Sequence, residues 1–144
     1  MSTIQGPSLT VDIIISANQD DKSGIVLIKR KNRPFGWALP GGFVDHGERV
    51  LDAAIREARE ETKLEIVAPT LFGVYSDPAR DPRGHTVSVV FTAVGRGILT
   101  AADDAREAAC FAQDELPEKL AFDHAQIIAD YHTSLQSEQP PFVR

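Results

Sequence analysis

Hydrophobic and polar residues along this chain follow two spacings, one typical of strands and one typical of helices. Four short apolar runs, rich in β-branched residues, predict strands at residues 9–16, 24–29, 65–76 and 86–94. The intervening segments are polar or dense in glycine and proline, which predicts loops at residues 18–23, 32–45, 77–85 and 95–105. The second of these loops is expected to contain short strand pieces. A further short apolar run follows the last loop, at residues 108–111.

Two segments carry the spacing of an amphipathic helix. The first is Glu48–Thr62, where apolar positions recur at i, i+3, i+4, i+7 and i+11: Leu51, Ala54, Ile55, Ala58 and Thr62. Asp45 stands three residues before Glu48, the offset of a capping box, so this helix is expected to begin near Asp45. The second helix is predicted at Asp123–Leu135, and residues 136–144 are expected to form an extended tail.

Strands on either side of a central helix, with another helix near the end, predict the α/β class and a mixed α/β sandwich. A length of 144 residues favours a single domain over residues 1–144. A chain of this size buries roughly 70% of its unfolded surface, which is enough for an ordinary core.

Composition narrows the classes of function. Hydrophobic residues make up 42% of the chain and charged residues 25%, as in ordinary globular proteins. The formal net charge of −6 argues against a nucleic-acid partner, and no apolar run approaches the roughly 18 residues of a membrane helix, so no membrane partner is expected. The single cysteine, Cys110, cannot form an internal disulfide, which fits a reducing cytoplasm. Both a monomer and a homodimer are compatible with these observations.

The candidate chemistry lies on the first predicted helix. Glu57, Glu60 and Glu61 fall within an arc of roughly 100° outside the apolar stripe, and Glu57 and Glu61 are one turn apart. Carboxylates this close repel one another, whereas hard oxygen ligands gathered together suit Mg²⁺ or Mn²⁺. The alternative is a solvated charged helix face, in which Arg56 and Glu60 form a surface ion pair.

The residues around this helix decide between the two interpretations. The stretch Gly42-(x5)-Glu48-(x7)-Arg56-Glu57-Ala58-Arg59-Glu60-Glu61-Thr62-Lys63-Leu64 resembles the Nudix box, G-x5-E-x7-R-E-U-x-E-E-x-G-U, where U is a bulky aliphatic residue. All five charged positions and the first glycine match. Ala58 is smaller than usual, and Lys63 replaces the second glycine, so Lys63 must adopt a positive φ or the helix must end differently.

The resemblance implies a Nudix-type α/β/α sandwich with a mixed β-sheet, and a divalent-metal-dependent attack of water on a diphosphate. It assigns Glu57, Glu60 and Glu61 as metal ligands for Mg²⁺ or Mn²⁺. Arg56 would orient a glutamate, and Glu48 would help to fix the helix start. For the general base, the candidates are Glu60 on the helix or an acid from the following loop, Glu107 or Asp104.

The resemblance also extends to the segment before the helix and to a second loop. Gly41 and Gly42 would let the backbone approach a diphosphate closely, while Trp37 and Phe43 are favoured as core residues. The segment 75–85 resembles one common in Nudix ADP-ribose pyrophosphatases, and its Arg80 and Arg83 could bind phosphate or ribose oxygens. Arg33 could supply a further phosphate contact, as could Lys29 and Arg30, for which the alternative is simply the end of a strand.

The expected partner is therefore a small nucleotide, and the favoured reaction converts ADP-ribose to AMP and ribose 5-phosphate. Two alternatives remain: an enzyme that releases pyrophosphate from (oxidised) nucleoside triphosphates, and a non-catalytic Nudix module that senses a metabolite.

Overall fold

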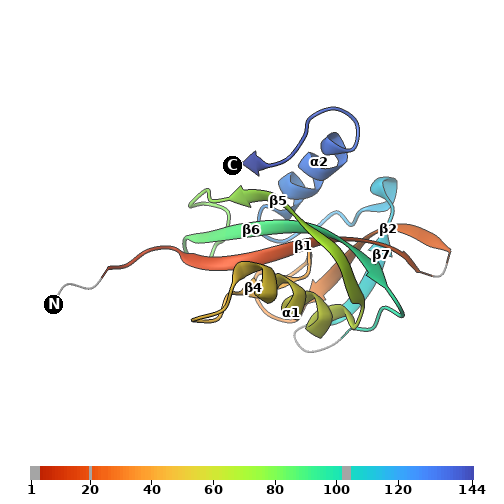
Figure 1. Ribbon diagram of the computed structural model, residues 1–144, viewed down its shortest axis with the longest axis horizontal. Helices are drawn as coiled ribbons and strands as arrows, with labels where there is room; N and C mark the ends of the chain where they lie inside the picture. Colours follow the sequence, from red (N-terminus) through yellow and green to blue (C-terminus); the bar gives the residue numbers. More distant parts are fainter. Residues whose placement is uncertain (1–3, 20, 102–104) are drawn as a thin grey trace.

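The computed structural model describes residues 4–19, 21–101 and 105–144. Figure 1 shows the order of its elements along the chain. These elements are β1 (Ser8–Gln19), β2 (Lys22–Arg30), β3 (Trp37–Ala38), β4 (Gly41–Phe43), α1 (Val50–Thr62), β5 (Glu65–Tyr75), β6 (Thr86–Arg96), β7 (Ala105–Phe111), the short 3₁₀ helix η1 (Gln113–Glu115), α2 (His124–Ser134) and β8 (Phe142–Val143).

The strands form one mixed sheet with the order β3-β2-β1-β6-β5-β8. β1 and β6 run parallel, whereas β2 lies antiparallel to β1, and β5 antiparallel to β6. β4 pairs with the first half of β1, β2 pairs with its last residues, and β7 pairs with β2 on its other edge. The predicted mixed sheet is confirmed.

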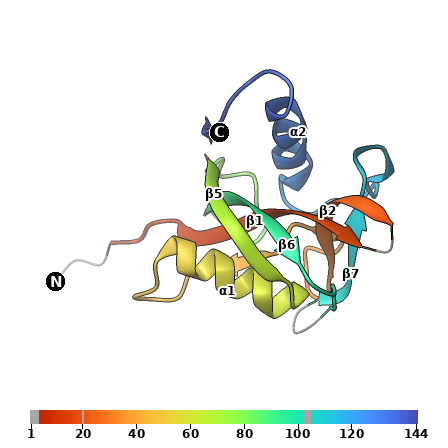
Figure 2. The ribbon, with the colours of Figure 1, turned by 45° about the vertical axis from the view of Figure 1, so that its right-hand side comes forward.

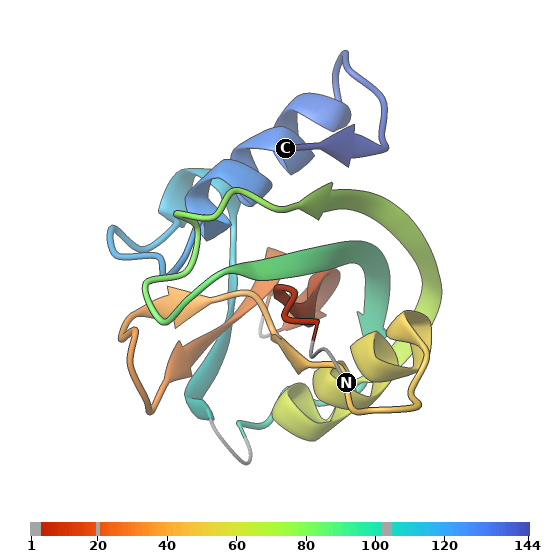
Figure 3. The ribbon, with the colours of Figure 1, turned by 90° about the vertical axis from the view of Figure 1, so that its left-hand side faces the viewer.

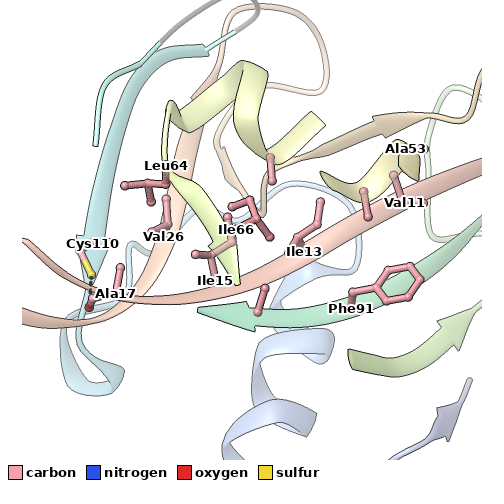
Figure 4. Close-up of a cluster of buried hydrophobic side chains, with 13 residues drawn as sticks. Val11, Ile13, Ile15, Ala17, Val26, Ala53, Leu64, Ile66, Phe91 and Cys110 are labelled. Atoms are coloured by element: carbon pink, nitrogen blue, oxygen red, sulfur yellow. Dashed lines mark hydrogen bonds between the residues drawn. The ribbon is translucent and has the colours of Figure 1, made fainter. Parts of the chain in front are cut away.

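Each face of the sheet packs against one helix. Successive side chains of a strand point to opposite faces, so β1 contributes to two separate cores. Val11, Ile13 and Ile15 belong to the core that contains the alanines of α1, whereas Ile14 belongs to the core of Ile127 on α2. Figures 1, 2 and 3 show α1 and α2 on opposite sides of the strands, and Figure 4 shows the first of these cores. The expected α/β/α sandwich is therefore confirmed.

The helix α1 begins later than the capping-box pattern predicted. Its first residue is Val50 and its N-cap is Arg49, so the predicted start near Asp45 is wrong. Asp45 and Glu48 do bond to each other: the backbone N–H of Asp45 donates to Glu48 Oε1, 3.0 Å away, and the Glu48 N–H donates to the Asp45 carbonyl. These bonds close a turn before the helix and do not cap it. The Glu48 side chain also accepts a hydrogen bond from Arg56.

The buried face of α1 differs from the predicted stripe at its first turn. Leu51 is 39% exposed, whereas Ala53 is fully buried together with Ala54 and Ala58. Small side chains at these positions let the helix backbone approach the sheet closely. At the other end Lys63 takes the left-handed conformation, with φ of 62°, and its N–H donates to the Arg59 carbonyl, so of the two alternatives the positive φ is the one present.

The segment after α2 returns to the sheet. Phe142 is buried and pairs with Gly73 of β5, and the Arg144 guanidinium donates to Asp130 at 3.0 Å. The segment expected to be an extended tail is thus held by a short strand and an ion pair. Among the described residues, none of the helices has the length and apolar character needed to cross a membrane.

Candidate active site

A cleft of about 290 Å³ opens beside β4 and α1. Its lining comes from segments far apart in the sequence: the strands β1, β2 and β4, the helix α1, the loop before β6 and the turn before α2. The volume is close to the lower limit of small-molecule sites, roughly 300–1,000 Å³.

Two of the three predicted carboxylate ligands, Glu57 and Glu61, line this cleft one helical turn apart. Glu61 is 5% exposed, and its Oε2 accepts a hydrogen bond from the backbone N–H of Gly41 over 3.2 Å. A Cβ on Gly42 would come within 2.6 Å of the Glu57 carboxylate carbon. The two glycines therefore allow the backbone of β4 to lie directly against both carboxylates.

Burial and mutual repulsion disfavour the charged forms of both carboxyl groups. Burial, together with the nearby charge of Glu57, raises the pKa of Glu61 to about 9. Burial also raises the pKa of Glu57, against the lowering effect of its hydrogen bond from Arg56. The pair holds a proton more readily than two negative charges, and a bound cation could replace that proton. A buried and a half-buried carboxylate in one cleft fit a hard divalent ion such as Mg²⁺ or Mn²⁺.

Arg56 holds the acidic groups at the edge of this pair. Its guanidinium donates to both oxygens of Glu48, at 2.8 and 2.9 Å, and to Glu57 Oε1 at 2.8 Å. It also donates to the Phe43 carbonyl of β4 at 3.2 Å. The side-chain hydrogen bond from Arg56 lowers the pKa of Glu48 to about 2. Arg56 thus fixes the orientation of Glu57, which is the positioning role that the resemblance implied.

Glu60, the third predicted ligand, points elsewhere. Its side chain is 47% exposed, lies outside the lining of the cleft and is 3.5 Å from Arg56 Nη1. Within residues 4–19, 21–101 and 105–144, no three His, Cys, Asp or Glu side chains form a ready metal site. The sequence predicted all three glutamates on one arc of the helix. In the fold, Glu57 and Glu61 face the cleft, and Glu60 faces solvent. The role of Glu60 as ligand or base stays a prediction.

The two arginines of the loop before β6 differ in their freedom to bind a ligand. Arg80 is 6% exposed, and its guanidinium donates to both oxygens of Asp123, at 2.7 and 3.0 Å, and to Thr86 at 2.7 Å. These bonds tie the loop to the turn before α2, and Arg80 also lines the cleft, so its role in substrate binding stays a prediction. Arg83 is paired with Asp81 at 2.9 Å, but its side chain is 40% exposed and lines the cleft.

Of the remaining predicted site residues, Arg33 and Glu107 lie outside the cleft lining. Arg33 is in the loop between β2 and β3, over the ring of Phe35. Glu107 is on β7, exposed, and 3.9 Å from Lys29. Asp104 lies outside the described residues, so its role as a base stays a prediction. Phe43, favoured as a core residue, is 47% exposed because it lines the cleft, whereas Trp37 does pack edge-on against Phe111.

Several side chains of the cleft lining were not among the predicted site residues. Arg30 was considered either a phosphate contact or a strand end, and the structure places it in the lining together with Asp12, Phe122 and His124. Asp12 carried a readable signal, because it is a lone acid inside an otherwise apolar strand. Phe122 and His124 gave none, since a short Phe-Asp-His segment before a helix has many uses.

Asp12 of β1 and His124, the first residue of α2, form a buried polar pair. Asp12 Oδ2 accepts a short hydrogen bond from Ser88, and Asp12 Oδ1 is 3.3 Å from His124 Nε2. His124 Nδ1 accepts a hydrogen bond from the Leu39 N–H at 3.0 Å, so the ring proton is on Nε2. That Nε2 makes no hydrogen bond of good geometry to any described group, although the charge of Asp12 faces it. His124 therefore cannot serve as a base through Nε2.

Comparisons with known proteins agree with this geometry. The chain is 55% identical over 128 residues to a protein named ADP-ribose pyrophosphatase from Methanocaldococcus jannaschii, covering 87% of this chain and 73% of the relative. It is similar to the NUDIX domain of Shewanella oneidensis NrtR, solved in complex with ADP ribose, with a TM-score of 0.82 and 28% identity over 92% of this chain and 91% of that one.

A third relative is a bifunctional NMN adenylyltransferase/ADP ribose pyrophosphatase from Francisella tularensis, solved with AMP and a manganese ion. Its TM-score is 0.76 at 27% identity, over 92% of this chain and 43% of that one. The family profile described as NUDIX domain matches residues 6–131, which contain every described residue of the cleft. The match of the NUDIX domain profile to residues 6–131, together with the 55% identity to the M. jannaschii relative, shows that this chain belongs to the Nudix family and is a pyrophosphohydrolase.

Proposed function

We propose that this protein hydrolyses ADP-ribose to AMP and ribose 5-phosphate with the help of a divalent metal ion. The observation that carries the proposal is the identity of 55% over 128 residues to the ADP-ribose pyrophosphatase of M. jannaschii. Two further structures, one with ADP ribose and one with AMP and manganese, belong to proteins of the same fold. The cleft supports this, because acidic and basic side chains line it together.

The proposed metal-binding residues are Glu57 and Glu61, with Glu60 as a further candidate. A divalent ion bound there would neutralise phosphate charge and lower the pKa of an attacking water. Mg²⁺ is the proposed ion and Mn²⁺ the alternative, since both prefer carboxylate oxygens. Arg56 keeps Glu57 in place, and the Gly41 N–H does the same for Glu61.

The proposed substrate contacts are Gly41, Gly42, Arg83 and Arg30. The first two bring backbone close to the carboxylate pair, where a diphosphate would lie. The guanidiniums of Arg30 and Arg83 supply positive charge and donors suited to phosphate oxygens. Arg80 and Arg33 are not part of this proposal, because the hydrogen bonds of Arg80 to Asp123 and Thr86 hold it in place and bury it, and Arg33 lies outside the cleft.

Substrate profiling tests the proposal. The purified protein with Mg²⁺ is given ADP-ribose, NADH and a set of dNTPs, and the products are separated by ion-exchange chromatography. We expect kcat/KM for ADP-ribose to exceed that for the other compounds, with AMP and ribose 5-phosphate in equal amounts. A preference for dNTPs with release of pyrophosphate would instead support the triphosphate hydrolase.

A second candidate function is the binding of ADP-ribose without turnover. The similarity to the NUDIX domain of NrtR, solved with ADP ribose, favours it. The same assay separates the two functions, because a sensor binds ADP-ribose in calorimetry but releases no AMP. The presence of both Glu57 and Glu61 in the cleft favours turnover.

A further inference from the structure

Phe122 occupies an unusual backbone conformation in the lining of the cleft. Its φ is 56°, in the left-handed region that a bulky non-glycine residue rarely adopts. Strained conformations of this kind persist only where the surroundings determine them, and they cluster at functional sites. We therefore consider which contacts hold Phe122 in this conformation.

The residues on either side of Phe122 are fixed to other parts of the fold. The Ala121 N–H donates to the Trp37 carbonyl at 2.8 Å, and the carboxylate of Asp123 accepts two hydrogen bonds from Arg80. One residue further, His124 Nδ1 accepts the Leu39 N–H at 3.0 Å. These bonds hold the turn from both sides, and Phe122 lines the cleft between them.

The ring of Phe122 meets two cations there. The guanidinium carbon of Arg30 is 4.9 Å from the ring centroid, and that of Arg83 is 5.1 Å from it. Arg83 also lies over the ring of Phe43 at 5.2 Å. Two guanidiniums brought into one cleft repel each other, and the negative face of an aromatic ring offsets part of that repulsion.

Both guanidiniums are anchored through part of their donors. Arg30 donates through Nε to the Pro34 carbonyl at 2.8 Å, and Arg83 donates through Nε and Nη2 to Asp81. No described residue accepts a hydrogen bond from Nη1 of either arginine in this structure. One donor group on each arginine is thus available to a ligand, and Glu57 and Glu61 line the same cleft.

We propose that Phe122 is a positioning residue, whose ring holds the guanidiniums of Arg30 and Arg83 together as a two-arginine clamp for the diphosphate group of the substrate. The inference rests on the proposed function, because it assigns the clamp to the diphosphate. The clamp supplies positive charge from the protein, and the carboxylate pair supplies a place for a cation. The ring itself does not touch the reacting atoms.

The test uses three substitutions at Phe122 and a matched control. Phe122→Leu removes the aromatic face and keeps an apolar side chain, whereas Phe122→Tyr keeps the face. Phe122→Gly removes the ring but accepts the positive φ without strain, so it separates the loss of the ring from any backbone strain in the leucine variant. The control is Phe35→Leu, because Phe35 carries Arg33 over its ring at 5.7 Å but lies outside the cleft.

Steady-state kinetics with ADP-ribose and inhibition by inorganic diphosphate are measured for each variant. We expect Phe122→Leu and Phe122→Gly to raise KM about tenfold, and the inhibition constant for diphosphate by the same factor, with kcat within about threefold. Phe122→Tyr and Phe35→Leu keep both constants at the wild-type value.

Three outcomes would overturn the proposal. The first is an unchanged inhibition constant for diphosphate with a raised KM, which would mean that the ring stacks on another part of the substrate. The second is an equal effect of Phe35→Leu, and the third is a loss of kcat alone. A wild-type protein that does not hydrolyse ADP-ribose would refute the proposed function separately, since binding of inorganic diphosphate, measured by calorimetry, still tests the clamp.

Discussion

Glu61 of α1 and Asp130 of α2 are equally buried, at 5% exposure each, and lie on opposite sides of the sheet. Burial and the charge of Glu57 raise the pKa of Glu61. Burial alone would also raise the pKa of Asp130, but hydrogen bonds from Arg144, Tyr75 and Gln126 lower it. The two side chains expose equally little surface, but Glu61 lies deeper in the protein and has fewer donors, so its pKa is raised whereas that of Asp130 is lowered.

The difference separates a structural region from a functional one. Asp130 accepts the Tyr75 hydroxyl at 2.7 Å and two bonds from Arg144, so the chain itself compensates its charge. Glu61 has the Gly41 N–H as a donor, but the charge with the largest effect on its pKa is that of another carboxylate, Glu57. An uncompensated buried carboxylate in a cleft is where a cation would bind, which is why strongly raised pKa values gather at functional sites.

The largest effect is expected from Glu61→Gln. Loss of a metal-binding carboxylate should lower kcat/KM for the preferred substrate by at least about a hundredfold. The metal-free variant should unfold at the same temperature as the wild type or higher, since the amide removes the repulsion with Glu57. Turnover close to the wild-type rate would refute the metal-binding role of Glu61, and calorimetry of Mg²⁺ binding provides the independent measurement.

Asp130→Ala should lower the stability of the protein and leave its activity nearly unchanged. We expect a loss of about 2–4 kcal/mol in the free energy of unfolding, because the buried Tyr75 hydroxyl and the Arg144 guanidinium lose their acceptor. Catalysis at low temperature should change by less than about twofold. Urea denaturation followed by circular dichroism measures the stability, and Arg144→Ala serves as the control, with a smaller loss because that side chain is 45% exposed.

The two carboxylates should also give opposite pH dependences of stability. The folded protein holds the Glu61 proton more tightly than the unfolded chain, so between pH 4.5 and about 9 the folded state binds more protons. The metal-free protein should therefore lose stability as the pH rises through this window, and Glu61→Gln should flatten the loss. The contribution of Asp130, whose pKa is lowered, is present above pH 3.8 and lost as the pH falls below it. Thermal unfolding at a series of pH values, without metal, checks both signs.

The smallest effect concerns the end of α1. Lys63 holds a φ of 62°, which glycine adopts at lower cost. We expect Lys63→Gly to stabilise the protein by up to about 1 kcal/mol. The kinetic constants should not change, because Lys63 is not in the cleft. A lowered midpoint of thermal unfolding would mean that the lysine side chain stabilises the fold by contacts that outweigh the backbone strain.

The helix and its acidic face were predictable from the sequence, but its boundaries and partners were not. The spacing of Ala54, Ala58 and Thr62 depends only on residues within one segment, so the sequence alone predicted the helix. The start near Asp45 was wrong because a capping-box pattern also describes the turn that Asp45 and Glu48 form before the helix. Which of the three glutamates would be buried depended on how the sheet packs against the helix.

For the arginines, too, the sequence did not reveal the partners of each side chain. Arg80 and Arg83 have the same chemistry and are three residues apart, so the sequence assigned both to the substrate. Arg80 is instead bound by Asp123, 43 residues away, and this pairing exists only once the loop before β6 and the turn before α2 are adjacent. Phe122 and Arg30 were brought into the cleft by the same packing.

What the amino-acid sequence determined by itself was the family motif, the mixed α/β class and the helix that carries Glu57 and Glu61, because these depend on residues close together in the chain. The tertiary structure decided which charges are compensated and which are not. Compensation depends on distances between segments that the chain brings together only on folding, such as Asp130 with Arg144, Arg80 with Asp123, and Glu61 with the backbone of Gly41.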